Sequence, residues 1–513
     1  MNVFSLRYAT LLLVSTAALQ AAPDISNINN CIKDVRQADL AAPSVPTFDS
    51  YTHDYRTLLS DLERAASTLP QVYQQTASTP LIRFLKNLGE TKFYQIFNRQ
   101  PTDQNSATLA QIIPDAALAI LTHQNFQAVG VNAFQEIISD LYDSFLSEEV
   151  RAGTQSGRPI EPPRYGVIPP LVKFGSAESG PYTWPCDATN EILGMSCAVV
   201  SLPPAQIVGG LLAWTSLGHE TGGHDVIHAD EGLIDELAQV VYDAVYKSFR
   251  SRSLASYWSN CIDETVSDVC GYLNLGPSAG PGLIGYFRAL GNGKLRATGS
   301  MDDPHPIDLL RGYLAAAVVK NLPFKEAAEW SQAISKETSK DDARLWLVDR
   351  FGIPHFFPVS FANAVASTEV VAKAILQTKL SSLQKHSLQD IQNWTDKDQQ
   401  IVDRLTTVLK TKGELPSDLR GPGFYASYVV ASATQAALQR GANISTIFNE
   451  MQTFLTLMHA ENATWSVQGS GEATALLEKG VRQANPENAS ITPKYVIHNV
   501  PELADEESLV AQG

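Results

Sequence analysis

A short histidine-rich segment constrains the fold of this chain more than any other feature. Residues 217–228, Leu-Gly-His-Glu-Thr-Gly-Gly-His-Asp-Val-Ile-His, contain three of the ten histidines. Glu220 directly follows the first of them, and an apolar run from Ile207 to Leu217 precedes the segment. Histidine and carboxylate side chains are common ligands of protein-bound zinc. We therefore predict that a buried helix carries these residues and that the rest of the fold supports them.

The spacing of the three histidines leaves two metal-binding arrangements open. His219 and His224 are five positions apart, which places their side chains about 140° from one another on a regular helix. Their rings converge on one ion only if the helix contains one extra residue as a π-type bulge, a distortion that Gly222–Gly223 tolerates. His224 and His228 share a helix face without a bulge, but this pairing leaves Glu220 one turn away. In a third interpretation the histidines are ordinary core or surface residues beside a flexible turn.

A second segment, from Trp258 to Gly271, supplies carboxylates. Its apolar residues recur at helical spacing and form one face: Trp258, Ile262, Val266 and Val269. Glu264 and Asp268 project together from another side of the same helix. One carboxylate can bind a metal while the other accepts the N–H of a ligating histidine and fixes its tautomer. Because two stacked acids repel each other, we expect a cation nearby. A solvated acidic face is the alternative.

Together the two segments resemble motifs of the gluzincin zinc metallopeptidases. Residues 264–271, Glu-Thr-Val-Ser-Asp-Val-Cys-Gly, are similar to the E-x-x-S-D-x-x-G helix of thermolysin-like enzymes. Residues 219–224, His-Glu-Thr-Gly-Gly-His, match the H-E-x-x-G-H variant of the dipeptidyl peptidase III family. The resemblance covers these two short motifs. It implies one zinc ion per chain and the following roles: His219, His224 and Glu264 as metal ligands, Glu220 as general base, and Asp268 as the residue that orients a histidine.

This set of residues predicts a hydrolytic mechanism. A zinc ion held by three protein ligands lowers the pKa of a bound water towards ~7. Glu220 would take a proton from that water as it attacks a peptide carbonyl, and would pass the proton to the leaving amine. An oxyanion forms and needs a partner. Our first candidate is His305, which prolines flank on both sides in the loop 302–306; Tyr286, Tyr313 and Arg311 are weaker candidates.

The expected fold class is α+β and mainly α. We predict a zincin-like catalytic core with a small β-sheet and a bulged active-site helix, flanked by helical lobes. The expected regions are a signal peptide (1–22), an N-terminal helical region (23–151), the zinc-binding core (152–355), and a C-terminal helical region with a peripheral tail (356–513).

Several elements of the core are predicted individually. A strand at Cys197–Leu202 has Tyr182–Trp184 as its possible partner. It is either an edge strand that pairs with an extended peptide substrate or a structural strand of a small sheet, and the sequence does not separate the two. Periodic apolar residues and breaker positions predict four helices: from Gln206 through the histidines, Leu233–Phe249, Ala255–Leu273 and Ile307–Asn321. Prolines at 80, 101 and 114 are expected to divide the N-terminal region into separate helices.

Composition and short motifs predict the location of the protein, its partners and its covalent modifications. The formal net charge of −16 makes nucleic acid an unlikely partner. Arg7 and the apolar run after it predict a secretory signal peptide, so we expect a secreted protein without stable membrane association. Four N-x-S/T sequons predict glycosylation: Asn393, Asn443, Asn462 and Asn488. A disulfide is expected among the five cysteines: Cys186 and Cys197 are close enough in sequence to pin a loop, but the pairing cannot be read from the sequence.

The sequence thus predicts a secreted zinc-dependent hydrolase, a metallopeptidase that acts on a peptide or protein substrate. The alternative is a secreted helical binding protein whose metal site is structural or inactive. Glu220 argues against the alternative, because a purely structural site has no use for a base at that position.

Overall fold

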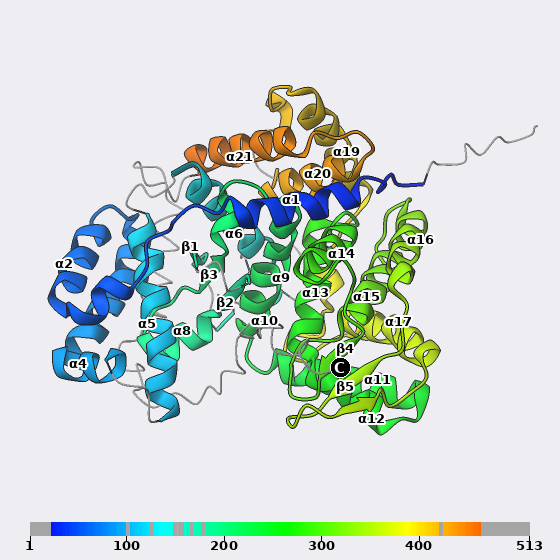
Figure 1. Cartoon of the computed structure of the whole chain (residues 1–513), viewed down its shortest axis with the longest axis horizontal. Helices are drawn as coiled ribbons and strands as arrows, with labels where there is room; N and C mark the ends of the chain where they lie inside the picture. Colours follow the sequence, from blue (N-terminus) through cyan, green and yellow to red (C-terminus); the bar gives the residue numbers. More distant parts are fainter. Residues whose placement is uncertain are drawn as a thin grey trace, which may run out of the picture.

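The fold is mainly helical, with two small sheets, as expected for an α+β protein dominated by helices (Figure 1). The computed structural model describes residues 22–98, 103–123, 128–146, 151, 159–161, 163–164, 168–175, 180–419 and 424–462. The predicted signal peptide (except Ala22), the peripheral tail and the sequon at Asn488 lie outside the described residues.

Helices account for most of the described chain. Those away from the histidine segment are α1 (Ile28–Leu40), α2 (Tyr55–Ala66), α3 (Gln71–Tyr73), α4 (Thr79–Phe97), α5 (Gln104–Thr122), α6 (Ala128–Leu146), α8 (Cys186–Leu193), α11 (Leu233–Phe249), α12 (Arg252–Asn260), α13 (Ile262–Leu275), α14 (Ala279–Leu290), α15 (Asp308–Lys320), α16 (Ala327–Thr338), α17 (Phe361–Gln377), α18 (Leu388–Ile391), α19 (Asp396–Thr411), α20 (Ala426–Leu438) and α21 (Ile444–Glu461). Among the described helices, none is long and apolar enough to cross a membrane.

Helices α2, α4 and α5 form a separate group with its own hydrophobic core, on the left of Figure 1. Asp54 and Asp103 cap α2 and α5 by accepting backbone N–H groups. Pro80 lies in the first turn of α4, where a missing N–H is tolerated. Pro114 lies inside α5, so the prediction that it divides two helices was wrong.

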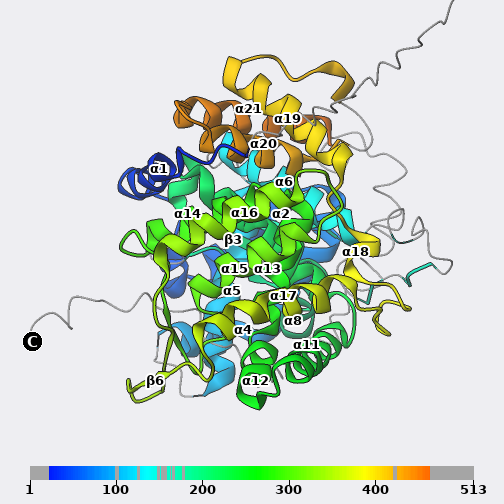
Figure 2. The ribbon, with the colours of Figure 1, turned by 90° about the vertical axis from the view of Figure 1, so that its right-hand side faces the viewer.

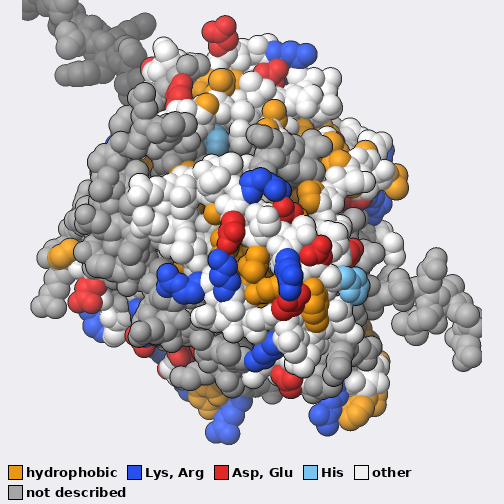
Figure 3. All heavy atoms as spheres, turned by 90° about the vertical axis from the view of Figure 1, so that its left-hand side faces the viewer, with side chains coloured by type: hydrophobic (Ala, Val, Ile, Leu, Met, Phe, Trp, Pro, Cys, Tyr) orange, Lys and Arg blue, Asp and Glu red, His pale blue; other side chains and the backbone are white. Residues whose placement is uncertain are grey.

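The surface of this helical group carries charges of both signs. Figure 3 shows Lys and Arg side chains next to Asp and Glu side chains on this face. Two of the ion pairs there are Arg56–Glu90, at 3.3 Å, and Lys86–Glu63, at 2.7 Å. Exposed pairs of this kind contribute about 0–1 kcal/mol each. The stability of the group therefore comes mainly from its apolar core.

A three-stranded sheet separates this group from the larger core. Its strands are β1 (Leu171–Phe174), β2 (Tyr182–Trp184) and β3 (Val199–Leu202), in the order β1-β3-β2. Leu171 and Val199 point into the smaller core, whereas Val172 and Val200 point into the larger one. The predicted strand and its partner are confirmed, since β2 pairs antiparallel with β3. However, β3 is the central strand and β2 lies at the edge.

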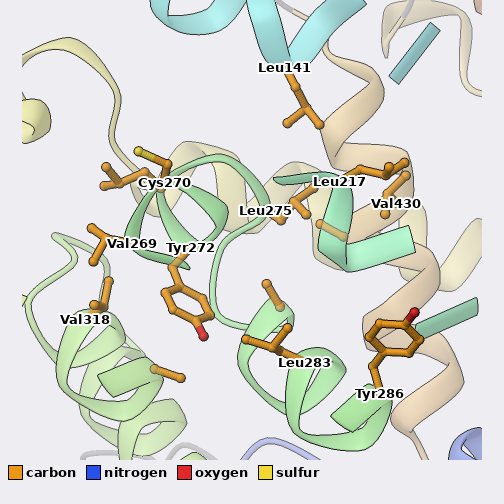
Figure 4. Packing of buried hydrophobic residues seen from close by; sticks show 14 of the residues in the cluster. Leu141, Leu217, Val269, Cys270, Tyr272, Leu275, Leu283, Tyr286, Val318 and Val430 are labelled. Carbon is orange, nitrogen blue, oxygen red and sulfur yellow. The ribbon is translucent and has the colours of Figure 1, made fainter. Parts of the chain in front are cut away.

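The larger core joins both ends of the described chain. Helix α1 lies along α14, and α6 packs against α21 (Figures 1 and 2). Asn27 ties the start of α1 to the end of α20, because its backbone N–H donates to Leu438 O at 2.9 Å. Leu217, Leu275 and Val318 lie in the middle of this core, contributed by the histidine segment, α13 and α15 (Figure 4).

The helices predicted for the central region agree with the observed helices to different degrees. Leu233–Phe249 is α11, and Ile307–Asn321 corresponds to α15. The helix expected at Ala255–Leu273 is two helices, α12 and α13, which meet at Cys261. The helix expected from Gln206 was wrong: two 3₁₀ helices precede the histidines, at Pro204–Ile207 and Leu211–Ser216.

A second sheet, absent from the predictions, lies beside the loop that carries His305. It consists of β4 (Thr298–Ser300), β5 (Trp346–Val348) and β6 (Pro354–Phe356), in the order β4-β5-β6. The N–H of Met301 donates to Val348 O at 2.8 Å and so fixes the start of the loop.

The predicted disulfide is not formed. All five cysteines are buried free thiols. Cys186 lies in the larger core, where its N–H donates to Asp225 Oδ1, whereas Cys197 lies in the smaller core on the other side of the sheet. Proximity in sequence therefore did not bring the two sulfur atoms together.

We predict that the unfolded, unreduced protein reacts with five equivalents of N-ethylmaleimide, whereas the native protein reacts slowly. Burial raises the pKa of Cys31 and of Cys270 to about 12, which removes the reactive thiolate at neutral pH. Mass spectrometry counts the adducts. Three adducts on the unfolded protein would reveal a disulfide and contradict the structure.

Candidate metal centre

The histidine segment contains the predicted π-type distortion. Helices α9 (Leu217–His219) and α10 (Val226–His228) flank a π-helical turn, η5 (Glu220–Asp225). The wider turn brings His219 and His224 to the same side of the segment. Their Nε2 atoms are 3.0 Å apart and their ring planes make an angle of 86°. Of the two arrangements that the sequence left open, the structure therefore contains the one that pairs His219 with His224 across a π-type bulge.

The two glycines of this turn have a packing role that the sequence did not reveal. A Cβ atom on Gly223 would lie 2.5 Å from both Cα and Cβ of Ser267 in α13. A Cβ atom on Gly222 would lie 2.7 Å from the side-chain amide nitrogen, Nδ2, of Asn274. Neither glycine has a positive φ angle. Glycine is therefore required here because α13 approaches closely.

Glu264, in the first turn of α13, completes a three-residue cluster. Its Oε2 lies 3.1 Å from His219 Nε2, and its Oε1 lies 3.4 Å from His224 Nε2. One ligand atom from each of the three residues lies within 4.8 Å of the others. The predicted ligands therefore converge. Glu264 and Asp268 also project from the same side of α13, as predicted, because both carboxylates reach His219.

Both histidines are held through their Nδ1 atoms. His219 Nδ1 lies 2.9 Å from Asp268 Oδ1, and His224 Nδ1 lies 2.8 Å from Asp263 Oδ1. A carboxylate in this position accepts an N–H from the ring, which leaves the lone pair on Nε2. Each lone pair then points towards the partner histidine and Glu264.

The expected cation beside the acidic pair is Arg311 from α15. Its guanidinium donates two hydrogen bonds to Asp268, at 2.7 and 2.8 Å, and both side chains are buried. Burial alone would raise the pKa of Asp268, but Arg311 and His219 hold it below its usual value. Asp268 is therefore ionised and fixed, as a residue that orients a metal ligand must be.

A divalent cation fits this set of donors. Two ring nitrogens and a carboxylate point their lone pairs at one position, and Glu264 Oε2 accepts no hydrogen bond from the described groups. Glu264 is 6% exposed, so water compensates its charge poorly. Two imidazoles, each oriented by an outer carboxylate, together with one ligating carboxylate are typical of catalytic zinc.

Glu220 lies next to this cluster but outside it. Its Oε2 accepts a hydrogen bond from Thr183 Oγ1 at 3.0 Å, and the side chain is buried. Thr183 belongs to β2, so the hydroxyl links the edge strand to the π-helical turn. Thr183 was missed in the sequence because it lies 37 positions before Glu220, without a motif around it.

His305 does reach the site. Its Nδ1 lies 2.6 Å from Asp303 Oδ1, and its Nε2 lies 3.1 Å from Glu264 Oε1. The side chain is 27% exposed, more than the 8% of Glu264, so it lies on the outer side of the cluster. Two of the three weaker candidates are occupied elsewhere, since Arg311 binds Asp268 and the hydroxyl of Tyr313 donates to Asp342.

His228 is not part of the three-residue cluster, although the sequence left that open. Its Nε2 lies 3.0 Å from Asp263 Oδ2, and its Nδ1 lies 3.1 Å from Asp187 Oδ2 in α8. Asp263 thus contacts both His224 and His228. Sequence reasoning missed Asp263 and Asp187. Asp263 directly precedes Glu264, and this adjacency was the one available signal.

We predict that Gly223→Ala lowers metal affinity and destabilises the fold by about 1–3 kcal/mol, because the new Cβ pushes η5 away from α13. The displacement separates Glu264 from the two histidines. Gly180→Ala is the matched control, since its added Cβ would meet nothing within 4 Å and its φ angle is not positive. Chemical unfolding and metal content after dialysis measure both effects. Equal metal affinity in the wild type and Gly223→Ala would show that the close approach is not needed.

Comparisons with known proteins add no family to this description. No family model, no curated protein and no solved structure matches the chain. The resemblance to gluzincin enzymes therefore stays a prediction from the two short motifs at 219–224 and 264–271. The description of the site as a metal centre depends on its own geometry, in which His219, His224 and Glu264 converge.

Proposed function

We propose that the protein is a zinc-dependent hydrolase with a zincin-like catalytic core, and that it cleaves peptide bonds. The observation that carries this proposal is the convergence of three ligand atoms, from His219, His224 and Glu264, within 4.8 Å. The outer hydrogen bonds of Asp268 and Asp263 support it, because they leave both Nε2 atoms free to bind an ion.

Glu220 and His305 have distinct roles in this proposal. A bound zinc ion supplies Lewis acidity and lowers the pKa of a bound water towards ~7. Glu220 takes the proton of the attacking water and passes it to the leaving amine. Thr183 holds the Glu220 carboxylate in place by donating to Oε2. Asp303 accepts the Nδ1–H of His305 and keeps the ring oriented, and the ring protonated on both nitrogens donates a hydrogen bond from Nε2 to the oxyanion.

The edge strand β2 supports a peptide as the substrate. Within the sheet, β2 pairs on one side with β3, and no strand of the described chain pairs with its other side. An extended peptide can add to such an edge through backbone hydrogen bonds. Thr183, at the centre of β2, contacts Glu220, so a peptide on this edge runs past the proposed base.

The burial of the site favours a second candidate, a binding protein with a structural or inactive metal centre. The side chains of His219 and Glu264 are 9% and 8% exposed, and Glu220 is 5% exposed. A structural site closes all ligand positions, whereas a catalytic site leaves one open. Glu220 itself opposes this candidate, because it lies beside the ion site without contributing to the three converging ligand atoms.

We expect the purified wild type and Glu220→Gln to contain one zinc per chain, as measured by inductively coupled plasma mass spectrometry. Only the wild type should cleave a peptide library, and the loss in Glu220→Gln should be about 100- to 10,000-fold. Glu231→Gln changes an exposed glutamate and serves as the matched control. Absence of zinc from the wild type would refute the proposal. Bound zinc without any hydrolysis would favour the binding protein.

A further inference from the structure

We propose that His228 is a positioning residue that holds the metal ligand His224 in its binding orientation, acting through Asp263 and anchored by Asp187. The inference rests on the metal centre of the proposed function, but it does not depend on whether that centre is catalytic. It assigns a role to the one histidine of the segment that does not belong to the ligand cluster.

A continuous chain of contacts carries the inference. From the ion site outwards, Asp263 Oδ1 lies 2.8 Å from His224 Nδ1, and Asp263 Oδ2 lies 3.0 Å from His228 Nε2. The other ring nitrogen of His228 lies 3.1 Å from Asp187 Oδ2. Each carboxylate oxygen of Asp263 thus contacts a different ring. Rotation of Asp263 away from His224 would break its contact with His228 as well.

The two metal-binding histidines are held by parallel but different arrangements. Behind His219, Asp268 is fixed by Arg311, a permanent cation that is 4% exposed. Behind His224, Asp263 is more exposed, with 36% of its side chain accessible. His228 takes the place beside Asp263 that Arg311 takes beside Asp268. An exposed carboxylate exchanges partners with water more readily, so Asp263 depends on this second contact.

The charge of His228 suits this position. Burial would lower its pKa, but Asp187 and Asp263 together raise it to about 10. The ring is therefore a cation at neutral pH and donates a hydrogen bond to each carboxylate. Asp225, also buried nearby, adds to the negative charge around it. Without His228, two carboxylates would face each other across the space that it fills.

The position of His224 explains why such support is needed. His224 lies on the π-helical turn η5, where the backbone lacks the regular hydrogen bonds of an α-helix. Two glycines precede it, so the residues directly before His224 have no side chain that could hold its ring. His228 lies one turn further on, in α10, where the regular helix resumes. The contacts through Asp263 therefore tie a ligand on the distorted turn to the regular helix beyond it.

The test compares zinc affinity across His228→Leu, His228→Gln, Asp187→Asn and the double variant His228→Leu/Asp187→Asn in the full chain. Competition with a chromophoric chelator gives the affinity, and the absorption spectrum of the cobalt-substituted protein reports the ligand geometry. We expect His228→Leu to bind zinc about 10- to 100-fold more weakly. His228→Gln retains one donor to Asp263 and should lose less. Asp187→Asn should weaken binding in the same direction.

The double variant is the decisive measurement. Because the proposed effect of Asp187 on the metal passes through His228, the double variant should bind zinc as His228→Leu does, whereas independent effects would add. Additive losses, or unchanged affinity and cobalt spectrum in His228→Leu, would overturn the inference. Complete loss of the metal would make His228 a ligand and would overturn it too.

Two controls separate this role from general destabilisation. His355→Leu removes an exposed histidine that contacts Asp349, and it should leave zinc affinity unchanged. Thermal unfolding of the metal-free variants shows whether the fold itself has weakened. If His228→Leu fails to fold, the near-isosteric Asp187→Asn still tests the inference. A wild type without zinc would refute the proposed function, whereas a zinc-binding wild type with unaffected variants would refute this inference alone.

Discussion

The contact between Gly223 and Ser267 brings the two halves of the site together, because the space between η5 and α13 has no room for another side chain. The distance between two packed helical segments depends on the side chains at their contact, and small residues allow a close approach. Gly218 makes a similar approach, with its missing Cβ 3.1 Å from Gly271 Cα. The donors from one segment therefore lie within reach of the carboxylates from the other. Tight packing and ligand convergence are two results of the same contact.

The packed site contains several carboxylates, and their negative charge needs compensation by cations. Glu220, Asp263, Glu264 and Asp268 lie in or beside the cluster, and Arg311 is the one described permanent cation that contacts any of them. A buried carboxylate without a partner is costly. His228 compensates part of this charge, at Asp263. The proposed metal ion would compensate further charge at Glu264, whose Oε2 accepts no hydrogen bond from the described groups.

The sequence predicted the local geometry of the site better than the supports around it. The five-residue spacing of His219 and His224 predicted the π-type turn, because helical geometry leaves no other way for the two rings to meet. The spacing of Glu264 and Asp268 predicted their shared face for the same reason. Both arguments are local, and local geometry follows from spacing alone.

Long-range contacts could not be predicted in this way. Thr183 and Asp187 reach the site only because the sheet and α8 pack beside η5, and no pattern in their own segments indicates it. The disulfide failed for the same reason, since Cys186 and Cys197 fall on opposite sides of a sheet whose strand order was unknown. The central position of β3 depends on β1, whose pairing partner lies 28 positions further along the chain.

The position of the sheet gives these long-range contacts a common origin. Because β3 is central, β2 becomes the edge strand, and its residue Thr183 reaches Glu220. The chain that follows β2 enters α8, whose first turn presents Asp187 to His228. Five residues of the chain thus run from the contact with the proposed base to the contact that supports a metal ligand. A shift of β2 would disturb both at once, so the sheet couples the orientation of Glu220 to that of His224.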